Sequence, residues 1–304
     1  MAIRRRSSCT SYNVLRRIIM LFRELGKTGI RIPVIGQGTW KFGEDKGREQ
    51  EEIEALRFGI ANGLKLIDTA EEYANGGAEK VVGKAIQGIR KEVFLVTKVS
   101  ARNCSYKGVL NSAEASLDRL KTGHIDLYLQ HWPSDQYDLS ETMGAMVELV
   151  NKGLVKYVGV SNFSIHLMER AQFHLGKVPL VCNQVGYHLN DRSIESDVLP
   201  FAKENGLTIM GYSPFGYAPG VFGMKGFPRV GSQERNVLES IGVKYNKTAH
   251  QVALNWVLRQ EGLVSIPKAS NKEHIIDNLN ALNWELEKED LEQIEFNFPF
   301  SGIS

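Results

Sequence analysis

Cysteine is scarce in this 304-residue sequence, and the three cysteines form no recognisable motif. Cys9, Cys104 and Cys182 stand far apart, without a C-x-x-C pair or a His/Cys cluster at metal-binding spacing. We therefore expect no structural zinc or other metal, and a reducing compartment, the cytoplasm.

Long apolar runs are also missing, and charge of one sign does not dominate. No apolar segment approaches the roughly 20 residues that a transmembrane helix needs. The net charge is +2, but residues 1–22 hold five arginines and no acid, so the remaining residues carry a net charge of −3. We expect a soluble protein with no membrane span and no nucleic-acid partner.

The first 21 residues differ in composition from the rest. They are rich in arginine and serine and lack acids, as transit peptides do, while the apolar stretch at residues 18–22 is too short for a secretory signal. The alternatives are a disordered tail and a start codon placed too early, with Met20 as the working start. We expect residues 1–21 to form a disordered extension and residues 22–304 to form one domain.

Short β-rich runs recur along that domain at a spacing near 30 residues, and segments with helical periodicity lie between them. The runs are mostly continuous apolar, as in a parallel sheet covered on both faces. The eight runs are residues 33–37, 64–68, 93–98, 125–131, 154–162, 180–184, 207–213 and 263–268. The helical segments include residues 49–61, 78–89, 109–120, 141–150, 195–204 and 250–258.

Strands that alternate with helices predict βαβ units and a parallel sheet. Eight units most simply close into an α/β fold, the (β/α)₈ TIM barrel, in which about 250 residues form a single domain. A hairpin at residues 22–32, turning around Lys27-Thr28-Gly29, is expected to plug the bottom of the barrel. Residues 287–295 are expected to add a C-terminal helix.

Polar residues stand where the predicted strands end, which is where a barrel of this kind builds its active site. Asp68, Lys98 and His131 end three successive strands, and Tyr73 follows in the loop after Asp68. Tyr73 would protonate the alkoxide formed by carbonyl reduction, Lys98 held by Asp68 would lower the phenol's pKa, and His131 would orient the carbonyl. Taken singly, each residue also has a structural explanation, such as a helix cap or a buried histidine.

At these residues the sequence resembles the aldo-keto reductase family, from about Leu21 to Glu295. The segment from Gly63 to Tyr73 is similar to the family's first signature, and the segment from Lys156 to Phe163 to its second. Val96-Thr97-Lys98 and Leu129-Gln-His131-Trp-Pro133 are similar to its lysine and histidine motifs. No G-x-G-x-x-G follows a predicted strand, which agrees with a family that binds its dinucleotide extended across the barrel mouth.

The resemblance implies Tyr73 as the general acid and a nicotinamide cofactor, NADPH, with NADH as the alternative. The residues implied at the nicotinamide are Ser161, Asn162, Gln184, Tyr212 and Ser213, with the Tyr212 ring stacked on the nicotinamide. The residues implied at the adenosine end are Lys268, Ser270, Asn271 and His274 for the 2′-phosphate and Asn278 for the adenine. Trp40 and Trp132 would line the substrate pocket.

The sequence departs from the family pattern at three positions. Gly186 stands where the family commonly has an acid, which affects local packing. Ala269 lacks the usual hydroxyl, and His274 replaces a typical arginine, so the expected preference for NADPH over NADH is weakened.

We therefore expect hydride transfer from NADPH, or NADH, to an aldehyde or ketone, carried out by a monomer on a small carbonyl substrate. Two other classes remain open: a nicotinamide-binding regulatory subunit with little turnover, like potassium-channel β subunits, and a phosphate-binding isomerase or aldolase barrel. Loops at residues 133–139 and 215–230 and the tail after Glu295 set the substrate in this family. Small aldehydes, α-dicarbonyls or sugar-like ketones are the expected range.

Overall fold

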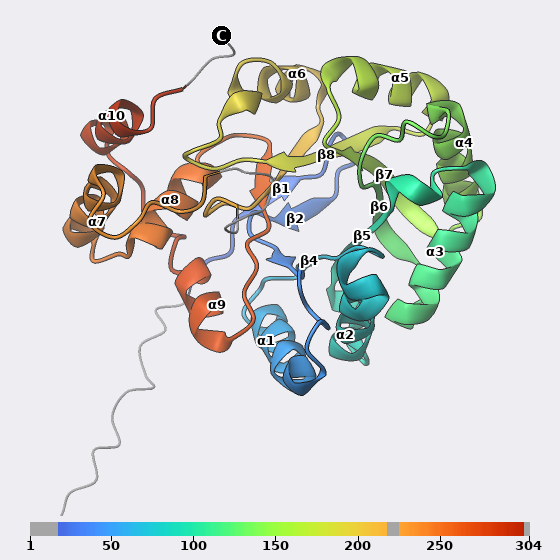
Figure 1. Cartoon of the computed structure of the whole chain (residues 1–304), viewed down its shortest axis with the longest axis horizontal. Helices are drawn as coiled ribbons and strands as arrows, with labels where there is room; N and C mark the ends of the chain where they lie inside the picture. Colours follow the sequence, from blue (N-terminus) through green and yellow to red (C-terminus); the bar gives the residue numbers. More distant parts are fainter. Residues whose placement is uncertain (1–17, 218–224, 301–304) are drawn as a thin grey trace, which may run out of the picture.

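The computed structural model describes residues 18–217 and 225–300, and its centre is a sheet of eight parallel strands (Figure 1). Each strand pairs with the next one in the sequence. The strands are β3 (Gln37–Gly38), β4 (Leu66–Asp68), β5 (Phe94–Val99), β6 (Ile125–Gln130), β7 (Val155–Ser161), β8 (Leu180–Gly186), β9 (Thr208–Tyr212) and β10 (Leu263–Ser265). Parallel bridges from Ile35 to Ser265 and from Gly38 to Lys268 join the first strand to the last. The sheet therefore closes, and the predicted barrel is confirmed.

Helices surround this sheet and connect its strands (Figure 1). They are α1 (Glu49–Ala61), α2 (Gly77–Ile86), α3 (Tyr106–Leu120), α4 (Leu139–Asn151), α5 (Ile165–Leu175), α6 (Val198–Asn205), α7 (Gln233–Tyr245), α8 (Ala249–Leu258), α9 (Lys272–Leu279) and α10 (Lys288–Asn297). The added C-terminal helix, α10, packs against α7 at the left of Figure 1. Lys244 on α7 holds the two together, with its Nζ 2.7 Å from Glu287 and 3.0 Å from Asp290.

The expected hairpin consists of β1 (Phe22–Glu24) and β2 (Arg31–Pro33), which pair antiparallel. Leu25 and Ile32 are 0% and 1% exposed and pack with Leu66 and Val96 from the barrel strands. The Thr208 hydroxyl at the start of β9 accepts from Gly26 N at 2.8 Å. The hairpin thus plugs the amino-terminal end of the barrel and leaves the other end for a site.

Side-chain caps explain where several helices begin. Ser105 accepts from the backbone N–H of Gly108 at the start of α3, and Ser164 and Ser232 make the equivalent bond at α5 and α7. Thr248 and Gln251 form a reciprocal capping box at α8. Such a cap contributes about 1 kcal/mol to helix stability.

Some element boundaries differ from the prediction. The first barrel strand was expected at residues 33–37 and is found at Gln37–Gly38, and Pro33 pairs with Phe22 in the hairpin instead. Residues 195–197 lie outside α6, which begins at Val198 after the cap Asp197. The helix α7 was not foreseen as a separate element before α8. None of the described helices combines the length and apolarity of a membrane span.

Residues 18–21, which we expected within the disordered extension, lie against the barrel. Ile19 N donates to Asn283 Oδ1, and Asn283 Nδ2 donates back to Ile19 O, both at 2.9 Å. The side chains of Ile18 and Met20 pack against a buried cluster that includes Leu64. Residues of the expected extension thus already contact the barrel at Ile18, and residues 1–17 lie outside the described residues.

Candidate active site

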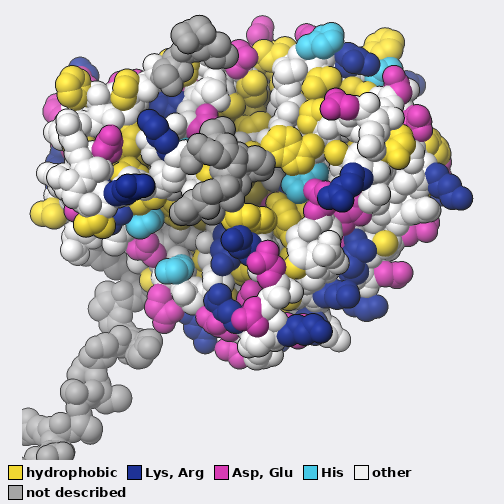
Figure 2. Space-filling model, in the orientation of Figure 1, with side chains coloured by type: hydrophobic (Ala, Val, Ile, Leu, Met, Phe, Trp, Pro, Cys, Tyr) yellow, Lys and Arg dark blue, Asp and Glu magenta, His cyan; other side chains and the backbone are white. Residues whose placement is uncertain are grey.

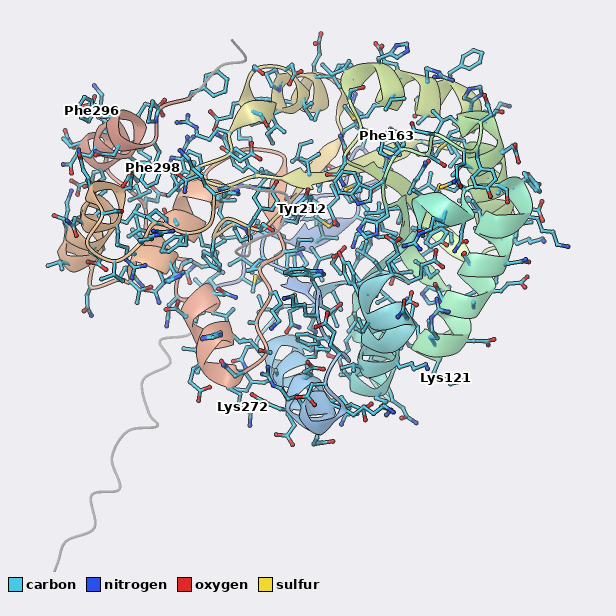
Figure 3. The ribbon with its side chains drawn as sticks, viewed as in Figure 1. Lys121, Phe163, Tyr212, Lys272, Phe296 and Phe298 are labelled. Atoms are coloured by element: carbon cyan, nitrogen blue, oxygen red, sulfur yellow. The ribbon has the colours of Figure 1, made fainter. Side chains whose placement is uncertain are left out.

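A cavity of about 1250 Å³ opens at the carboxyl ends of the barrel strands. Pockets that hold a drug-sized ligand measure roughly 300–1,000 Å³, so this one has room for more than one small molecule. Hydrophobic side chains gather near the centre of the face in Figure 2, and Tyr212, at the end of β9, is labelled near the middle of Figure 3. The expected residues that line the cavity are Trp40, Asp68, Tyr73, His131, Trp132, Ser161, Asn162, Gln184, Tyr212, Ser213 and Lys268.

Asp68 and Lys98 form a buried ion pair below the cavity floor. Lys98 is 0% exposed, and its Nζ donates to Asp68 Oδ2 and to Thr69 O, each at 2.8 Å. The phenol oxygen of Tyr73 lies 3.4 Å from the same Nζ. Burial lowers the pKa of Lys98, and the Asp68 carboxylate counteracts this shift. The sequence prediction that these three side chains converge agrees with this geometry.

The pKa of Tyr73 shifts in the direction opposite to our expectation. Desolvation raises it well above its ordinary value, and the carboxylates of Asp68 and Glu72 raise it further. The ammonium of Lys98 does not reverse this shift, because its charge is already balanced by Asp68 at 2.8 Å. Tyr73 therefore keeps its proton at neutral pH.

His131 follows β6 and faces Tyr73, with the two rings edge-to-face and their centroids 5.6 Å apart. Its Nδ1 lies 3.0 Å from Glu72 Oε2, off the direction of an aligned hydrogen bond. Burial lowers the pKa of His131, and Glu72 counteracts part of the shift. His131 and a hydrogen bond from the Ser100 hydroxyl hold the pKa of Glu72 at about 2 against the effect of burial. The cavity wall thus carries a carboxylate beside a neutral imidazole at pH 7.

Three side chains at the ends of β7 and β9 form one polar network. Asn162 Nδ2 donates to His131 O at 3.2 Å and to Ser161 Oγ at 3.1 Å, and its Oδ1 accepts from the Tyr212 hydroxyl at 3.0 Å. Asn162 has a φ of 62°, in the left-handed region that asparagine tolerates better than most residues. The network fixes the edge of the Tyr212 ring at the cavity.

Gln184, which is expected to bind the nicotinamide, donates a hydrogen bond to a side chain below the cavity. Its Nε2 donates to Asp68 Oδ1 at 2.7 Å, so both oxygens of the buried carboxylate have a donor. Gln184 is 2% exposed and still lines the cavity. This amide therefore connects the expected nicotinamide residues to the Asp68–Lys98 pair.

At the expected adenosine end, Lys268 is joined by an arginine that the sequence analysis did not select. Lys268 Nζ lies 3.2 Å from Ser270 Oγ, and Arg48 Nη2 lies 3.3 Å from the same oxygen. Burial lowers the pKa of Lys268, and the positive charges of Arg48 and Lys41 lower it further. Two cations thus meet at the Ser270 hydroxyl, and the negative charges of Glu52 and Glu44 counteract part of the pKa shift of Lys268.

The other expected residues of this end do not line the cavity. Asn271 is the N-cap of α9, where its Oδ1 accepts from His274 N at 2.8 Å. His274 is exposed, and Asn278 is buried within α9. Ser270 is 6% exposed and reaches the site only through Lys268 and Arg48.

The glycine that departs from the family pattern makes room for an aromatic side chain. A Cβ atom on Gly186 would lie 2.1 Å from the Tyr217 hydroxyl. That hydroxyl donates to Asp191 Oδ2 at 3.2 Å, and the Tyr217 ring packs edge-to-face on Tyr212 with centroids 6.2 Å apart. Gly186 therefore allows Tyr217 to form part of the cavity wall.

Glu72 and Arg48 are the functional candidates that sequence reasoning missed. Glu72 had a signal, since it is the second acid of the Glu71-Glu72 pair directly before Tyr73. Arg48 had none, because its partner Ser270 is 222 residues away. No group of three His, Cys, Asp or Glu side chains suited to a metal ion occurs within residues 18–217 and 225–300.

Comparison with known proteins is consistent with this geometry. Residues 34–296 match the model of the aldo/keto reductase family. The chain is 41% identical over 270 residues to methylglyoxal reductase YeaE of Escherichia coli, covering 89% of this chain and 92% of that protein. It is 34% identical over 271 residues to glyoxal reductase of Bacillus subtilis, covering 88% and 89%.

Solved structures show the same similarity. An aldo/keto reductase from Klebsiella pneumoniae in complex with NADP and acetate superposes with a TM-score of 0.80 at 39% identity, covering 88% of this chain and 92% of that one. A thermostable aldo-keto reductase in complex with epalrestat superposes with a TM-score of 0.83 at 38% identity, covering 91% and 100%. The chain therefore belongs to the aldo/keto reductase family and is an NAD(P)H-dependent oxidoreductase that transfers hydride to carbonyl groups.

Proposed function

We propose that this reductase acts on small uncharged aldehydes and α-dicarbonyls, with Tyr73 as the proton donor. The observation that carries the proposal is the convergence of Asp68, Lys98 and Tyr73 on the cavity, with Lys98 Nζ 2.8 Å from the carboxylate and 3.4 Å from the phenol. The names of two relatives, a methylglyoxal reductase and a glyoxal reductase, support the substrate class.

NADPH supplies the hydride when it is bound. Tyr73 donates its phenolic proton to the carbonyl oxygen, so that the carbonyl becomes an alcohol and the tyrosine a phenolate. Lys98 is the cation next to that phenolate, 3.4 Å from the oxygen, and the Asp68 carboxylate keeps Lys98 charged in its buried position. A high pKa in the resting protein is compatible with this role, because Tyr73 then carries its proton when the substrate arrives.

The residues around the cavity have the chemistry that such a cofactor requires. Ser161, Asn162 and Gln184 present hydroxyl and amide groups that suit a carboxamide, and Tyr212 presents an aromatic ring. Lys268 and Arg48 at Ser270 supply cations for a phosphate, and arginine adds a forked donor that lysine lacks. Asn271, His274 and Asn278 stay proposed neighbours of the adenosine, with Asn271 acting through the N-terminus of α9.

The charge of the cavity wall restricts the substrate. Glu72 lines the cavity, and its pKa of about 2 keeps it anionic at every physiological pH. Trp40 and Trp132 present aromatic surface that is 40% and 37% exposed. A neutral carbonyl compound fits these walls, whereas a keto acid would bring a second negative charge next to Glu72.

A panel of carbonyl compounds followed by NADPH oxidation tests the function, with Tyr73→Phe as the diagnostic variant. We expect turnover of methylglyoxal, glyoxal and nitrobenzaldehyde and weaker turnover of pyruvate. Tyr73→Phe should bind NADP⁺ normally and lose about 10²–10⁴-fold in turnover, because the ring remains and the acid is deleted. A variant that keeps a third of wild-type turnover in a rate-limiting chemical step would contradict the assignment. A wild type that binds NADPH without any turnover would favour a regulatory role.

We also assign the protein to a reducing compartment, the cytoplasm, and to a monomeric state. Cys104 and Cys182 are buried free thiols, which suits a reducing environment. The barrel closes within one chain, and every residue assigned to the site comes from that chain.

A further inference from the structure

The geometry points to Glu72 as a positioning residue that fixes the proton of His131 on Nδ1, so that Nε2 faces the substrate as an acceptor in the neutral ring. This inference rests on the proposed carbonyl reduction and adds to it the protonation state in which His131 can assist. Glu72 Oε2 lies 3.0 Å from Nδ1 of His131, and His131 lines the cavity.

Both oxygens of Glu72 have a partner that holds the carboxylate in this place. Ser100 Oγ donates to Oε1 at 2.7 Å, which leaves Oε2 for the imidazole. Ser100 is itself 4% exposed and caps the short 3₁₀ helix Ala101–Asn103. Arg102, 3.5 Å away with a side chain 84% exposed, contributes little. The carboxylate is thus directed at His131 by a buried hydroxyl.

The imidazole is equally fixed. His131 N donates to Val99 O at 2.9 Å, and its carbonyl accepts from Asn162 Nδ2 at 3.2 Å. The ring meets Tyr73 edge-to-face. The side chain of His131 is 12% exposed. A small rotation of these side chains would align Nδ1 of His131 with Glu72 Oε2. Catalytic hydrogen bonds often become aligned in this way when substrate binds.

The tautomer follows from elementary acid–base chemistry. An ionised carboxylate has no proton to donate, so a hydrogen on the nitrogen opposite it is favoured over a lone pair, which the carboxylate would repel. A neutral imidazole has a single N–H, and Nε2 is then a lone-pair acceptor. A carbonyl oxygen is also an acceptor, so Nε2 of neutral His131 cannot donate a hydrogen bond to it. The imidazolium, with both nitrogens protonated, can.

The charged groups around His131 determine when the imidazolium forms. Glu72, from the loop after β4, and Asp68, at the end of β4, favour it, while Lys98 on β5 and burial oppose it. Tyr73 is the remaining titratable neighbour and stays protonated. Burial outweighs the acids, so the pKa of His131 lies below its ordinary value. We expect kcat/KM for an uncharged aldehyde to fall as the pH rises from 5.5 to 7.5, by at most tenfold per pH unit.

Two measurements on the full-length protein test this inference. Long-range ¹H–¹⁵N correlation NMR on the seven histidines, with His131→Gln for assignment, reports which imidazole nitrogen is protonated at pH 8, with and without NADP⁺. The second measurement is the pH profile of kcat/KM in the wild type and in Glu72→Gln. The glutamine amide can either donate to Nδ1 or accept from it, so the variant no longer fixes the imidazole proton on Nδ1. We expect kcat/KM of this variant to decrease severalfold less with rising pH than kcat/KM of the wild type.

Glu71→Gln is the matched control, since Glu71 Oε1 accepts from Ser100 N at 2.6 Å and from Asn103 Nδ2 at 3.0 Å. We expect this variant to keep the wild-type tautomer and pH profile. An Nε2-protonated neutral ring in the wild type, or equal profiles in wild type and Glu72→Gln, would overturn the inference. If the wild type reduces no carbonyl compound, the proposed function fails, and the NMR spectrum still decides the tautomer.

Discussion

Arg48 is the single residue that most changes the interpretation of the cofactor site. The sequence shows a histidine, His274, where the family typically has an arginine. In the structure a guanidinium reaches the same region from the short 3₁₀ helix Lys46–Arg48 before α1, with Arg48 Nη2 3.3 Å from Ser270 Oγ. An arginine fork binds phosphate bidentately, which neither a histidine nor a lysine side chain can do.

We predict that Arg48→Gln weakens NADP⁺ binding about 10- to 100-fold, as expected for a lost charge-assisted hydrogen bond of about 1.5–3 kcal/mol. NAD⁺ binding should change less than about twofold. Titration calorimetry with both nucleotides measures the ratio. Arg57→Gln is the control, because Arg57 on α1 donates to the backbone of Ala85 and Lys84. Equal losses for both nucleotides would remove Arg48 from phosphate recognition, and a larger effect of His274→Ala would restore the interpretation based on sequence.

His188 carries a prediction about stability at mildly acidic pH. It is 2% exposed, and burial lowers its pKa to about 4 from 6.5. The unfolded chain therefore binds the proton first, and the free energy of unfolding should fall as the pH falls from about 6.5 to 4. One pKa unit corresponds to about 1.4 kcal/mol, which sets an upper limit of about 3.5 kcal/mol for this group. Urea unfolding at pH 7.5, 6 and 5 should show a smaller decrease in His188→Gln. A wild type and a variant with parallel pH dependence would contradict the prediction.

At the scale of elements, the sequence predicted the order and type of most strands and helices, while boundaries moved where two elements compete for the same residues. Pro33 was predicted as the start of a barrel strand, yet it pairs with Phe22 in the hairpin. The strands β3 and β10 shrink to 2 and 3 residues, and isolated bridges complete the barrel there. Hydrophobic pattern cannot choose between two possible partners for one apolar segment, because both bury it.

The hairpin's role as a plug can be tested with Leu25→Ala. Leu25 is fully buried against Leu66 and Val96, so truncation should cost about 2–5 kcal/mol of unfolding free energy. Phe22→Ala is the control, since Phe22 is 43% exposed and surface substitutions usually change stability by about 0.5 kcal/mol or less. Urea denaturation measures both, and kcat/KM should be unchanged at 25 °C. A loss below about 1 kcal/mol in Leu25→Ala would show that the plug adds little.

At the scale of the whole molecule, the closed barrel and its single-chain site predict a catalytically complete monomer. Light scattering coupled to size exclusion should give a mass near 34.1 kDa. Activity per mole should stay constant over a hundredfold dilution, because dilution separates weak oligomers by mass action. A specific activity that falls on dilution together with a doubled mass would show that a second copy completes the site.

The sequence by itself determined the α/β barrel and four side chains of the site. Eight mostly apolar runs that alternate with helical segments most simply form a closed parallel sheet, and polar residues at the strand ends then meet at one rim. The tertiary structure alone decided what these residues touch. Gln184 reaches Asp68 across 116 residues and Arg48 reaches Ser270 across 222, distances over which a local pattern carries no information. The direction of the Tyr73 pKa shift also depends on burial and on Glu72. Desolvation and charge balance are properties of the packed state, and so they appear only once the barrel is closed.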